Sequence, residues 1–513
     1  MAYKTFATID VGSTDVTMKI FEVTTKKGYR LLDYVSNIIE LGSDTYKSGY
    51  VSQTSVDRLC DILVRFTKKM REYGTVDYCA YATSAIREAK NGVMVLDLLK
   101  LRTGLEIKTI SNSEHRFLLY KGLAVKAENF ETIVSKNTAI VDIGGGSVQI
   151  SLMGNKKLNA TQNLPIGALR VRDRLQSLRV DRSQLEGIME EFIANEIDTF
   201  RHHYLGDKEI KNVIAIGDEI ENLIKLVPEL GITDCLNEEQ LNAIYERLLS
   251  MNTIDLAEEY KIPYERATLL LPAAMIYGIF LKQAKADLIW TPKIDLCDGM
   301  IVDVLEKNKR ISFERDFDDD IRSCVFHLAK RYQCNKEHNL NVSAIAMEIF
   351  DKTKKIHGLG RKEKLQLEIA ARLHDCGKFI NMNNSGVNSY AIIMSTEIMG
   401  ISHVEREEIA NIVRYNSVPL PDYNQLHSMI GDCDYMKIAK LVAILKVANA
   451  MDRSHKQKVN AYNISVKEKQ LLINIDTLYD LTLERGLFDD KADFFQRVYG
   501  IKPVLKQKGA RKS

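Results

Sequence analysis

The chain has 513 residues, enough for about three domains with sizeable cores. Its 71 Lys and Arg nearly balance its 69 Asp and Glu, so no net charge favours nucleic acid or a membrane surface. The eight cysteines show no CxxC pair and no metal-ligand spacing, which is typical of reduced thiols in the cytoplasm. The longest uncharged run, 267–281, is too short to span a bilayer and contains Pro272, so we expect a buried core helix there. These features predict a cytoplasmic protein that binds neither nucleic acid nor membrane.

The first predicted elements form a hairpin. A strand at 7–11 carries Asp10, a turn of small residues follows, and 16–20 reads as the returning strand. The turn consists of Gly12, Ser13 and Thr14. A second turn at 26–28 leads to a third segment that ends near Leu41 and Gly42.

Helices and strands then alternate. A helical pattern at 56–73 precedes a strand at 78–82 and a helix start at 83–91 that carries Arg87. A strand at 106–111 delivers Glu114 to the start of an amphipathic helix at 116–125. This alternation indicates an α/β core.

The order of the first hairpin recurs later in the chain. A strand at 139–143 carries Asp142, three glycines and Ser147 make a turn, and strands follow up to Ile166 and Gly167. Because Gly144, Gly145 and Gly146 lack a Cβ, their N–H groups can form a nest that admits an anion. Two matched copies predict a duplicated fold whose two turns face one cleft. The alternative is a chance similarity between two ordinary hairpin turns.

The remainder of the chain is increasingly helical. Helices at 185–204 and up to 285 flank a strand at 213–216, and a strand at 287–290 leads to a helix at 300–305. From about residue 311 onward strand patterns nearly vanish, which places a domain boundary near residue 306. A short strand is expected at 470–475 and a solvated basic tail at 502–513.

Several motifs occur in an order that matches a known family. They are Ile9-Asp-Val-Gly-Ser13, Ala82-Thr-Ser-Ala-Ile-Arg87, Ile110-Ser-Asn-Ser-Glu114, Val141-Asp-Ile-Gly-Gly-Gly-Ser147, Leu164-Pro-Ile-Gly167, Leu373-His-Asp-Cys-Gly-Lys-Phe379 and Ile412-Val-Arg-Tyr415. With them the chain resembles the exopolyphosphatase and guanosine pentaphosphate phosphohydrolase (Ppx/GppA) family of the actin-like ATPase superfamily. The resemblance implies two ribonuclease-H-like lobes, 1–127 and 128–305, and a helical HD-type domain with a small C-terminal extension, 306–513.

The resemblance also implies a site. It assigns a terminal phosphate of the substrate to a set of eight residues: Gly12, Ser13, Thr14, Arg87, Gly144, Gly145, Gly146 and Ser147. It assigns Mg²⁺ to Asp142 and Asp10, and it makes Glu114 the base that activates the attacking water. On the residues alone, Arg87 could be a helix-surface arginine and Glu114 a charge favoured at a helix start.

The chain departs from the family at four points near this site. Gln149 replaces a usual glutamate, and Phe117 takes the place of an arginine, with Arg116 one position early. Asp218 with its neighbour Glu219 stands where a Gly-Thr pair is usual, and we expect these acids to repel phosphate. Cys297-Asp298-Gly299 stands where Arg-Glu-Gly is usual, so a cation is lost there. Together these changes predict reduced turnover.

The helical region carries part of an HD metal signature. His338, His374 and Asp375 match three core ligands, whereas Asn449 stands where the fourth, an aspartate, is expected. Asn388 and Asn416 stand where further histidines are common. We therefore expect a domain that has lost independent catalysis and that extends a substrate channel instead.

These interpretations lead to one expected function and two alternatives. We expect Mg²⁺-dependent hydrolysis of the terminal phosphate of inorganic polyphosphate. The alternatives are hydrolysis of the 5′-terminal phosphate of guanosine pentaphosphate, and a sensor that binds phosphate or a nucleotide with little turnover. Family resemblance further implies a homodimer formed through the helical domain.

Overall fold

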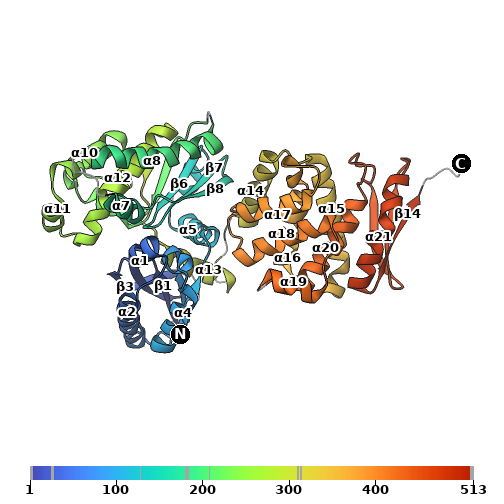
Figure 1. The fold of residues 1–513 in the computed structure, drawn as a ribbon, viewed down its shortest axis with the longest axis horizontal. Coiled ribbons are helices and arrows are strands. Elements are labelled where there is room, and N and C mark those ends of the chain that lie inside the picture. Colours follow the sequence, from blue (N-terminus) through green and yellow to red (C-terminus); the bar gives the residue numbers. More distant parts are fainter. Residues whose placement is uncertain are drawn as a thin grey trace. The chain divides into compact units, whose positions relative to one another are not determined.

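The computed structural model describes residues 4–24, 28–127, 129–178, 184–206, 208–308, 311, 313, 315–431 and 433–508. The chain forms two compact units, Met1–Asp316 and Phe317–Ser513. Figure 1 shows the first unit in blue to yellow-green and the second in yellow to red. The lysines of the turn expected at 26–28 lie outside the described residues.

The first sheet of the first unit has five strands in the order β3-β2-β1-β4-β5. Apolar alternation puts side chains such as Ile9, Met18 and Ile20 into a core that helix α2 covers on one side. The elements of this half are β1 (Lys4–Val11), β2 (Asp15–Val23), β3 (Tyr29–Ile38), α1 (Leu41–Ser48), α2 (Gln53–Glu72), β4 (Asp77–Ala82), α3 (Ser84–Glu88), α4 (Gly92–Thr103), β5 (Lys108–Thr109), α5 (Asn112–Lys126) and α6 (Phe130–Ile133).

The second sheet has six strands in the order β10-β11-β9-β6-β7-β8. Strand β6 is buried along its whole length, including Asp142, and its apolar residues Ile140, Val141 and Ile143 predict a buried strand. The elements are β6 (Thr138–Ile143), β7 (Val148–Gly154), β8 (Lys157–Leu164), α7 (Ala168–Ser177), α8 (Leu185–Phe200), a π-helical turn (Arg201–Leu205), β9 (Asn212–Ile216), α9 (Asp218–Ile224), β10 (Cys235–Asn237), α10 (Glu238–Ser250), α11 (Thr253–Glu259), α12 (Tyr264–Ala284), β11 (Leu288–Trp290) and α13 (Leu296–Lys307).

The two sheets repeat one topology, as the sequence predicts. In each, three consecutive strands form an antiparallel meander, and a fourth strand then pairs in parallel with the first: β4 with β1, and β9 with β6. The second strand of each sheet also carries an equivalent irregularity. The register of the β2–β3 pair shifts after Ile20, and that of the β7–β8 pair shifts after Leu152. Both aspartates, Asp10 and Asp142, occupy equivalent places near the ends of the first strands.

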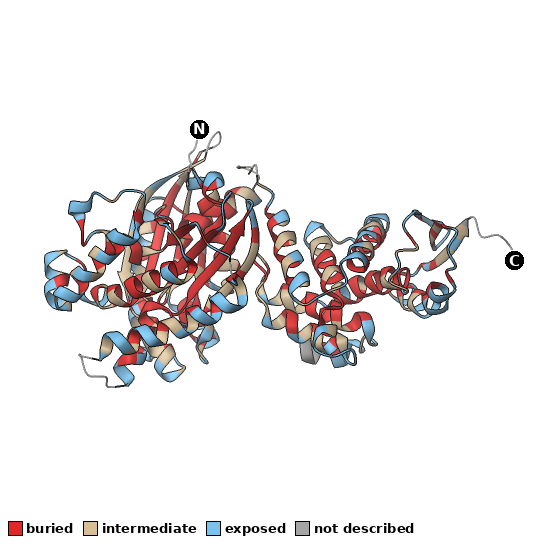
Figure 2. Ribbon diagram, turned by 90° about the horizontal axis from the view of Figure 1, so that it is seen from above, coloured by how far each residue is buried: buried red, intermediate tan, exposed pale blue. Residues whose placement is uncertain are grey.

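Helix α12 contains the long uncharged run and packs inside the first unit. Among the described residues it is the one helix long and apolar enough to cross a membrane, and 67% of its apolar window is buried. Leu270, Ala273 and Ile276 are fully buried. Figure 2 shows such buried segments at the centre of the unit, so the prediction of a core helix is confirmed.

The second unit is mostly helical but ends in a small sheet. Its elements are α14 (Phe317–Arg331), α15 (Lys336–His357), α16 (Arg361–Leu373), a 3₁₀ turn (Cys376–Phe379), α17 (Ser385–Ser395), α18 (His403–Ser417), α19 (Tyr423–Ile430), α20 (Tyr435–Ala450), β12 (Tyr462–Lys467), β13 (Gln470–Asp476), α21 (Thr482–Tyr499) and β14 (Lys502–Lys508). The strand expected at 470–475 is β13. The prediction of a solvated tail from residue 502 is wrong up to Lys508, because β14 pairs in parallel with β13 and buries Pro503. Arg511 and Lys512 lie outside the described residues.

Candidate active site

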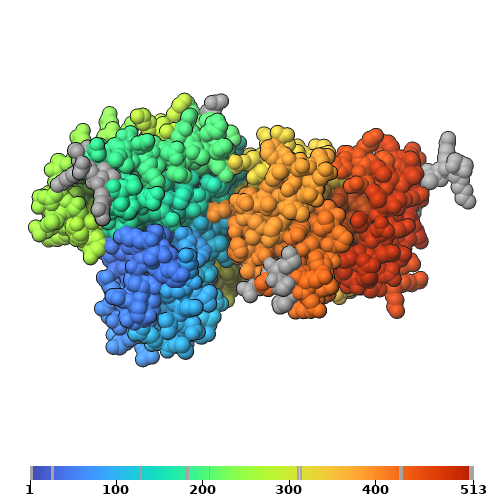
Figure 3. Space-filling view, viewed as in Figure 1, coloured from blue at the N-terminus to red at the C-terminus, as the bar shows by residue number. Residues whose placement is uncertain are grey.

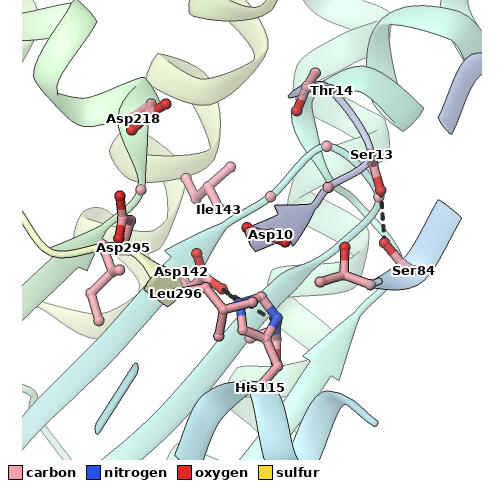
Figure 4. A pocket seen from close by; sticks show the side chains of 18 of the residues that line it. Asp10, Ser13, Thr14, Ser84, His115, Asp142, Ile143, Asp218, Asp295 and Leu296 are labelled. Carbon is pink, nitrogen blue, oxygen red and sulfur yellow. Dashed lines mark hydrogen bonds and ion pairs between the residues drawn. The ribbon is translucent and has the colours of Figure 1, made fainter. Parts of the chain in front are cut away.

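A polar pocket opens where the first hairpins of the two sheets meet. It contains Asp10 and Asp142, which point into the same space in Figure 4. The lining residues are Asp10, Gly12, Ser13, Thr14, Asp15, Thr17, Thr83, Ser84, Asn112, His115, Leu119, Asp142, Ile143, Gly144, Gly145, Gly146, Ser147, Gln149, Ile216, Gly217, Asp218, Glu219, Asp295, Leu296 and Cys297. All predicted phosphate and metal residues except Arg87 belong to this set.

The two glycine turns approach each other closely. A Cβ on Gly145 would lie 3.2 Å from the Cβ of Ser13, and one on Gly146 would lie 1.9 Å from the hydroxyl oxygen of Tyr46. That hydroxyl is hydrogen-bonded to Ser13 Oγ at 2.8 Å, and Ser13 Oγ in turn to Ser84 Oγ at 2.9 Å. Figure 3 shows the blue and green halves of the unit in contact. Only glycine fits at position 146, since the backbone there touches a hydroxyl network from the other half.

The second turn keeps its N–H groups available. Gly144 N donates to Ser147 O at 3.0 Å, and the carbonyls of Gly144 and Gly145 accept from the start of α7 at 3.1 and 2.9 Å. Within the described chain, the N–H groups of Gly145, Gly146 and Ser147 donate to no other group. A Cβ on Gly167 would lie 2.3 Å from Ser147 N, which explains the glycine that ends the Leu164–Gly167 motif. Three free donors on one turn have the arrangement that a nest for an anion requires.

Carboxylates dominate the charge of the pocket. Six line it, whereas no Lys or Arg is among the lining residues. Burial, reinforced by neighbouring carboxylates, holds the pKa of Asp10 well above its usual value. Burial also raises the pKa of Asp142 to about 7, against the opposing effect of Arg116. The pocket therefore favours a cation beside any bound phosphate.

The residues present fit a magnesium ion. Oδ1 of Asp10 is buried and has no hydrogen-bond partner in the protein, and Asp142 faces the same space. No group of three His, Cys, Asp or Glu side chains is preassembled for a metal anywhere in the described chain. Mg²⁺ is commonly held by one or two carboxylates together with water and substrate phosphate, so two aspartates suffice.

Two acids at the departures from the family pattern form ion pairs. Arg266 of α12 contacts Asp15 at 2.9 Å and Asp218 at 3.2 Å. Asp298, 1% exposed, contacts Lys19 at 2.9 Å and Lys126 at 2.7 Å. Burial alone would raise the pKa of Asp298, but the charges of the two ammonium groups have the larger effect, and its pKa is lowered. Arg266 offsets part of the charge of Asp218, and Asp298 is part of a buried ion-pair network. The expected repulsion of phosphate by Asp218 stays a prediction.

Burial also keeps Glu219 from adding a negative charge. Its side chain is buried, and burial raises its pKa to about 8 despite the nearby Arg266 guanidinium. Near neutral pH its carboxyl is therefore mostly protonated. A protonated Glu219 adds no charge to the pocket, and the expected repulsion of phosphate by this acid stays a prediction.

Neither Glu114, at the start of α5, nor Arg87, in α3, lines the pocket. Glu114 Oε2 accepts from Ser111 N at 2.9 Å and from Ser111 Oγ at 2.8 Å, which completes a capping box. Arg87 donates to Ile110 O at 2.7 Å and to Asn112 Oδ1 at 2.6 Å. Both side chains hold the end of the helix, and a catalytic role for Glu114 stays a prediction that this geometry does not support.

His115, the next residue, lines the pocket and was not predicted. Its Nδ1 lies 2.8 Å from Gln149 Nε2, and its Nε2 lies 3.9 Å from Asp142 Oδ2. Burial, then the charges of Arg87 and Arg116, lower the pKa of His115 to about 3, so the imidazole is neutral. Figure 4 shows His115 beside Asp142. The unusual sequence Glu114-His-Arg116 marks this position as different from the family pattern. The sequence alone does not determine which of these side chains faces the pocket.

Comparisons with known proteins agree with this geometry. The model of the "Ppx/GppA phosphatase family" matches residues 20–308, and that of "Ppx/GppA phosphatase, domain III" matches residues 321–492. The chain belongs to the Ppx/GppA phosphatase family. It is accordingly a hydrolase that acts on phosphoanhydride bonds.

The individual relatives are distant. A guanosine-5′-triphosphate,3′-diphosphate pyrophosphatase of Photobacterium profundum is 19% identical over 475 residues, 92% of this chain and 91% of that protein. A protein of the same name from Vibrio parahaemolyticus is 18% identical over 433 residues, which cover 83% of this chain and 83% of that protein. The crystal structure of an exopolyphosphatase from Cytophaga hutchinsonii has a TM-score of 0.54 at 18% identity and covers 60% of this chain and 100% of that one. These levels establish the fold and the family but not the substrate.

The second unit buries a histidine cluster at the predicted HD positions. Nε2 of His338 lies 3.2 Å from Nε2 of His374, and its Nδ1 lies 2.8 Å from Asp452 Oδ2. Asp375 instead accepts from Asn339 Nδ2 at 2.6 Å. Asp452, three residues after Asn449, thus holds His338 in place from its far side. The loss of independent catalysis in this unit remains a prediction.

Proposed function

We propose that this Ppx/GppA family member hydrolyses the terminal phosphate of inorganic polyphosphate. The observation that supports the proposal best is the nest of free N–H groups on Gly145, Gly146 and Ser147, opposite the hydroxyls of Ser13 and Thr14. Such a set of uncharged donors binds the oxygens of one phosphoryl group without needing a particular chain attached to it.

The lining residues favour polyphosphate over a nucleotide. Among the described residues that line the pocket there is no Phe, Tyr or Trp, and the apolar ones are small or aliphatic, such as Leu119 and Leu296. A guanine base usually needs an aromatic or extended apolar surface, which this pocket does not offer. Hydrolysis of guanosine pentaphosphate is the second candidate, because the Photobacterium and Vibrio relatives carry the name of that activity.

Magnesium belongs to the proposal as the partner of Asp10 and Asp142. Bound there, it would offset the charge of the phosphates and polarise the bond under attack. The chain itself contributes the N–H nest, which holds the terminal phosphoryl group, and the closely packed turns, which exclude bulk water around it. Arg266 pairs with the lining acids Asp15 and Asp218 and so limits their repulsion of phosphate.

The test compares two substrates in parallel. Phosphate release is measured from long-chain polyphosphate and from guanosine pentaphosphate, with and without Mg²⁺, for the wild type and for Asp142→Asn. We expect release from polyphosphate that requires Mg²⁺ and falls at least about a hundredfold in Asp142→Asn. Release from guanosine pentaphosphate alone would replace the proposal by the second candidate. Binding of polyphosphate without release would identify a sensor.

A further inference from the structure

Gln149 is held in one orientation by two neighbours. It is 5% exposed and lies on β7, opposite Asp142 on β6. Its Nε2 donates to His115 Nδ1 at 2.8 Å and to Asp142 Oδ2 at 3.2 Å. An amide NH₂ group has two hydrogens, so these two acceptors use its whole donor capacity.

The carboxylate decides which way the amide faces. When Asp142 is ionised, as a carboxylate that holds Mg²⁺ must be, a flipped amide would place its oxygen 3.2 Å from Asp142 Oδ2, and two acceptors would face each other. With Gln149 Nε2 turned toward Asp142, the second amide hydrogen meets Nδ1 of His115 at 2.8 Å, so the ring serves as a second acceptor. Asp142 therefore sets the position of Gln149 Oε1, and His115 holds the amide there.

That oxygen is left without a donor. Oε1 of Gln149 is buried and has no hydrogen-bond partner in the protein. Buried acceptors are rarely left unsatisfied, and an exception at a functional site calls for a partner from outside the chain. Because Gln149 lines the phosphate pocket, the donor that completes it comes from the pocket, as a water molecule or a substrate group.

We propose that Gln149 Oε1 accepts a hydrogen bond from the attacking water and orients it toward the terminal phosphorus, and that His115 is the positioning residue that holds Gln149. The inference rests on the proposed function. It differs from base catalysis by Glu114, whose carboxylate caps its own helix. An amide that orients water without removing its proton is an established device in phosphoryl transfer, where bond breaking runs ahead of bond making.

The proposed step needs no strong base. The oxygen of water attacks the terminal phosphorus while the bond from that phosphorus to the bridging oxygen breaks. The bonding pair leaves with the shortened polyphosphate, and both protons of the water leave with the released phosphate as dihydrogen phosphate. Gln149 changes neither its charge nor its protonation in this step.

The experiment separates orientation from structure. Values of kcat and KM for long-chain polyphosphate with Mg²⁺ are compared for wild type, Gln149→Leu, His115→Leu and His115→Asn. Gln162→Leu, on the neighbouring strand β8 and outside the lining residues, is the matched control. Thermal unfolding of each variant checks that it is folded.

The expected pattern is specific. Gln149→Leu lowers kcat about a hundredfold with little change in KM, since the water and not the substrate loses its partner. His115→Leu lowers kcat at least about tenfold, and His115→Asn recovers most of that loss because the Asn Oδ1 can accept from Gln149 Nε2 in place of Nδ1. The His115 pair keeps the test decisive if Gln149→Leu does not fold.

Two results would overturn the inference while leaving the proposed function intact. One is an active wild type whose kcat is unchanged in Gln149→Leu. The other is a loss in His115→Leu that His115→Asn does not recover. A wild type that releases no phosphate from polyphosphate would instead remove the proposed function on which the inference rests.

Discussion

Gly146→Ala should damage both the fold and the pocket. The added Cβ would lie 1.9 Å from the Tyr46 hydroxyl oxygen and 2.7 Å from its Cζ, where ordinary contacts begin at 3.4 Å. Tyr46 cannot simply swing away, because its hydroxyl is bonded to Ser13 and Ser84 and Arg170 lies 4.0 Å from its ring. The turn must therefore retreat by more than an ångström. Overpacking of this kind costs about 2 to 3 kcal/mol, roughly a 30- to 160-fold change in the folding equilibrium.

The assay uses the single tryptophan of the chain. Trp290 lies in β11 of the first unit, so urea unfolding followed by its fluorescence reports on that unit. The KM for polyphosphate should rise at least about tenfold, because the N–H nest moves with the turn. Gly187→Ala is the control: nothing lies within 4 Å of that added Cβ, and the change in helix α8 should stabilise by about 0.5 to 1 kcal/mol. Equal stability of wild type and Gly146→Ala would refute the reasoning that the two turns are in contact.

Three further predictions concern charges around the pocket. Burial raises the pKa of Glu219 to about 8, so its stabilising contribution is complete at low pH and is lost as pH rises through 8. The urea midpoint of the wild type should therefore be lower at about pH 9 than at about pH 6, and this difference should be much smaller in Glu219→Gln. The same pH difference in both proteins would contradict the prediction. Asp298→Asn removes the buried carboxylate that Lys19 and Lys126 share, although Asp295 still contacts Lys19 at 2.7 Å. The loss should be about 2 kcal/mol in the Trp290 unfolding curve, and a loss below about 0.5 kcal/mol would show that the network is dispensable. Glu114→Gln keeps an acceptor for the helix cap, so the free energy of unfolding should change by less than about 0.5 kcal/mol and kcat by less than about threefold. Glu114→Ala removes the acceptor and should lose about 1 kcal/mol of stability. A fall of kcat by about a hundredfold in Glu114→Gln would instead support a catalytic role for Glu114.

The topology was predictable because it depends on simple repeated patterns. Strand alternation and glycine turns at residues 12 and 144–146 predicted two equivalent hairpins, and the parallel pairs β1–β4 and β6–β9 follow from the helices between their strands. Strand β14 was missed because its lysines read as a tail. On an edge strand such charges are common, since they discourage pairing with other chains.

The details of the site were less predictable. Glu114 and His115 are adjacent, and successive helical residues differ by about 100° in direction, so only the exact start of α5 decides which one faces the pocket. That start is set by the capping box with Ser111, which uses the Glu114 carboxylate. The partners of Asp218 and Asp298 were likewise hidden, because Arg266, Lys19 and Lys126 are distant from them in sequence.

A crystal structure of the protein soaked with Mg²⁺ and inorganic phosphate tests the central claim most directly. We expect phosphate hydrogen-bonded to the N–H groups of Gly145, Gly146 and Ser147, and a metal ion bound by Asp10 and Asp142. Phosphate bound elsewhere, with this pocket empty at saturating concentrations of both, would contradict it.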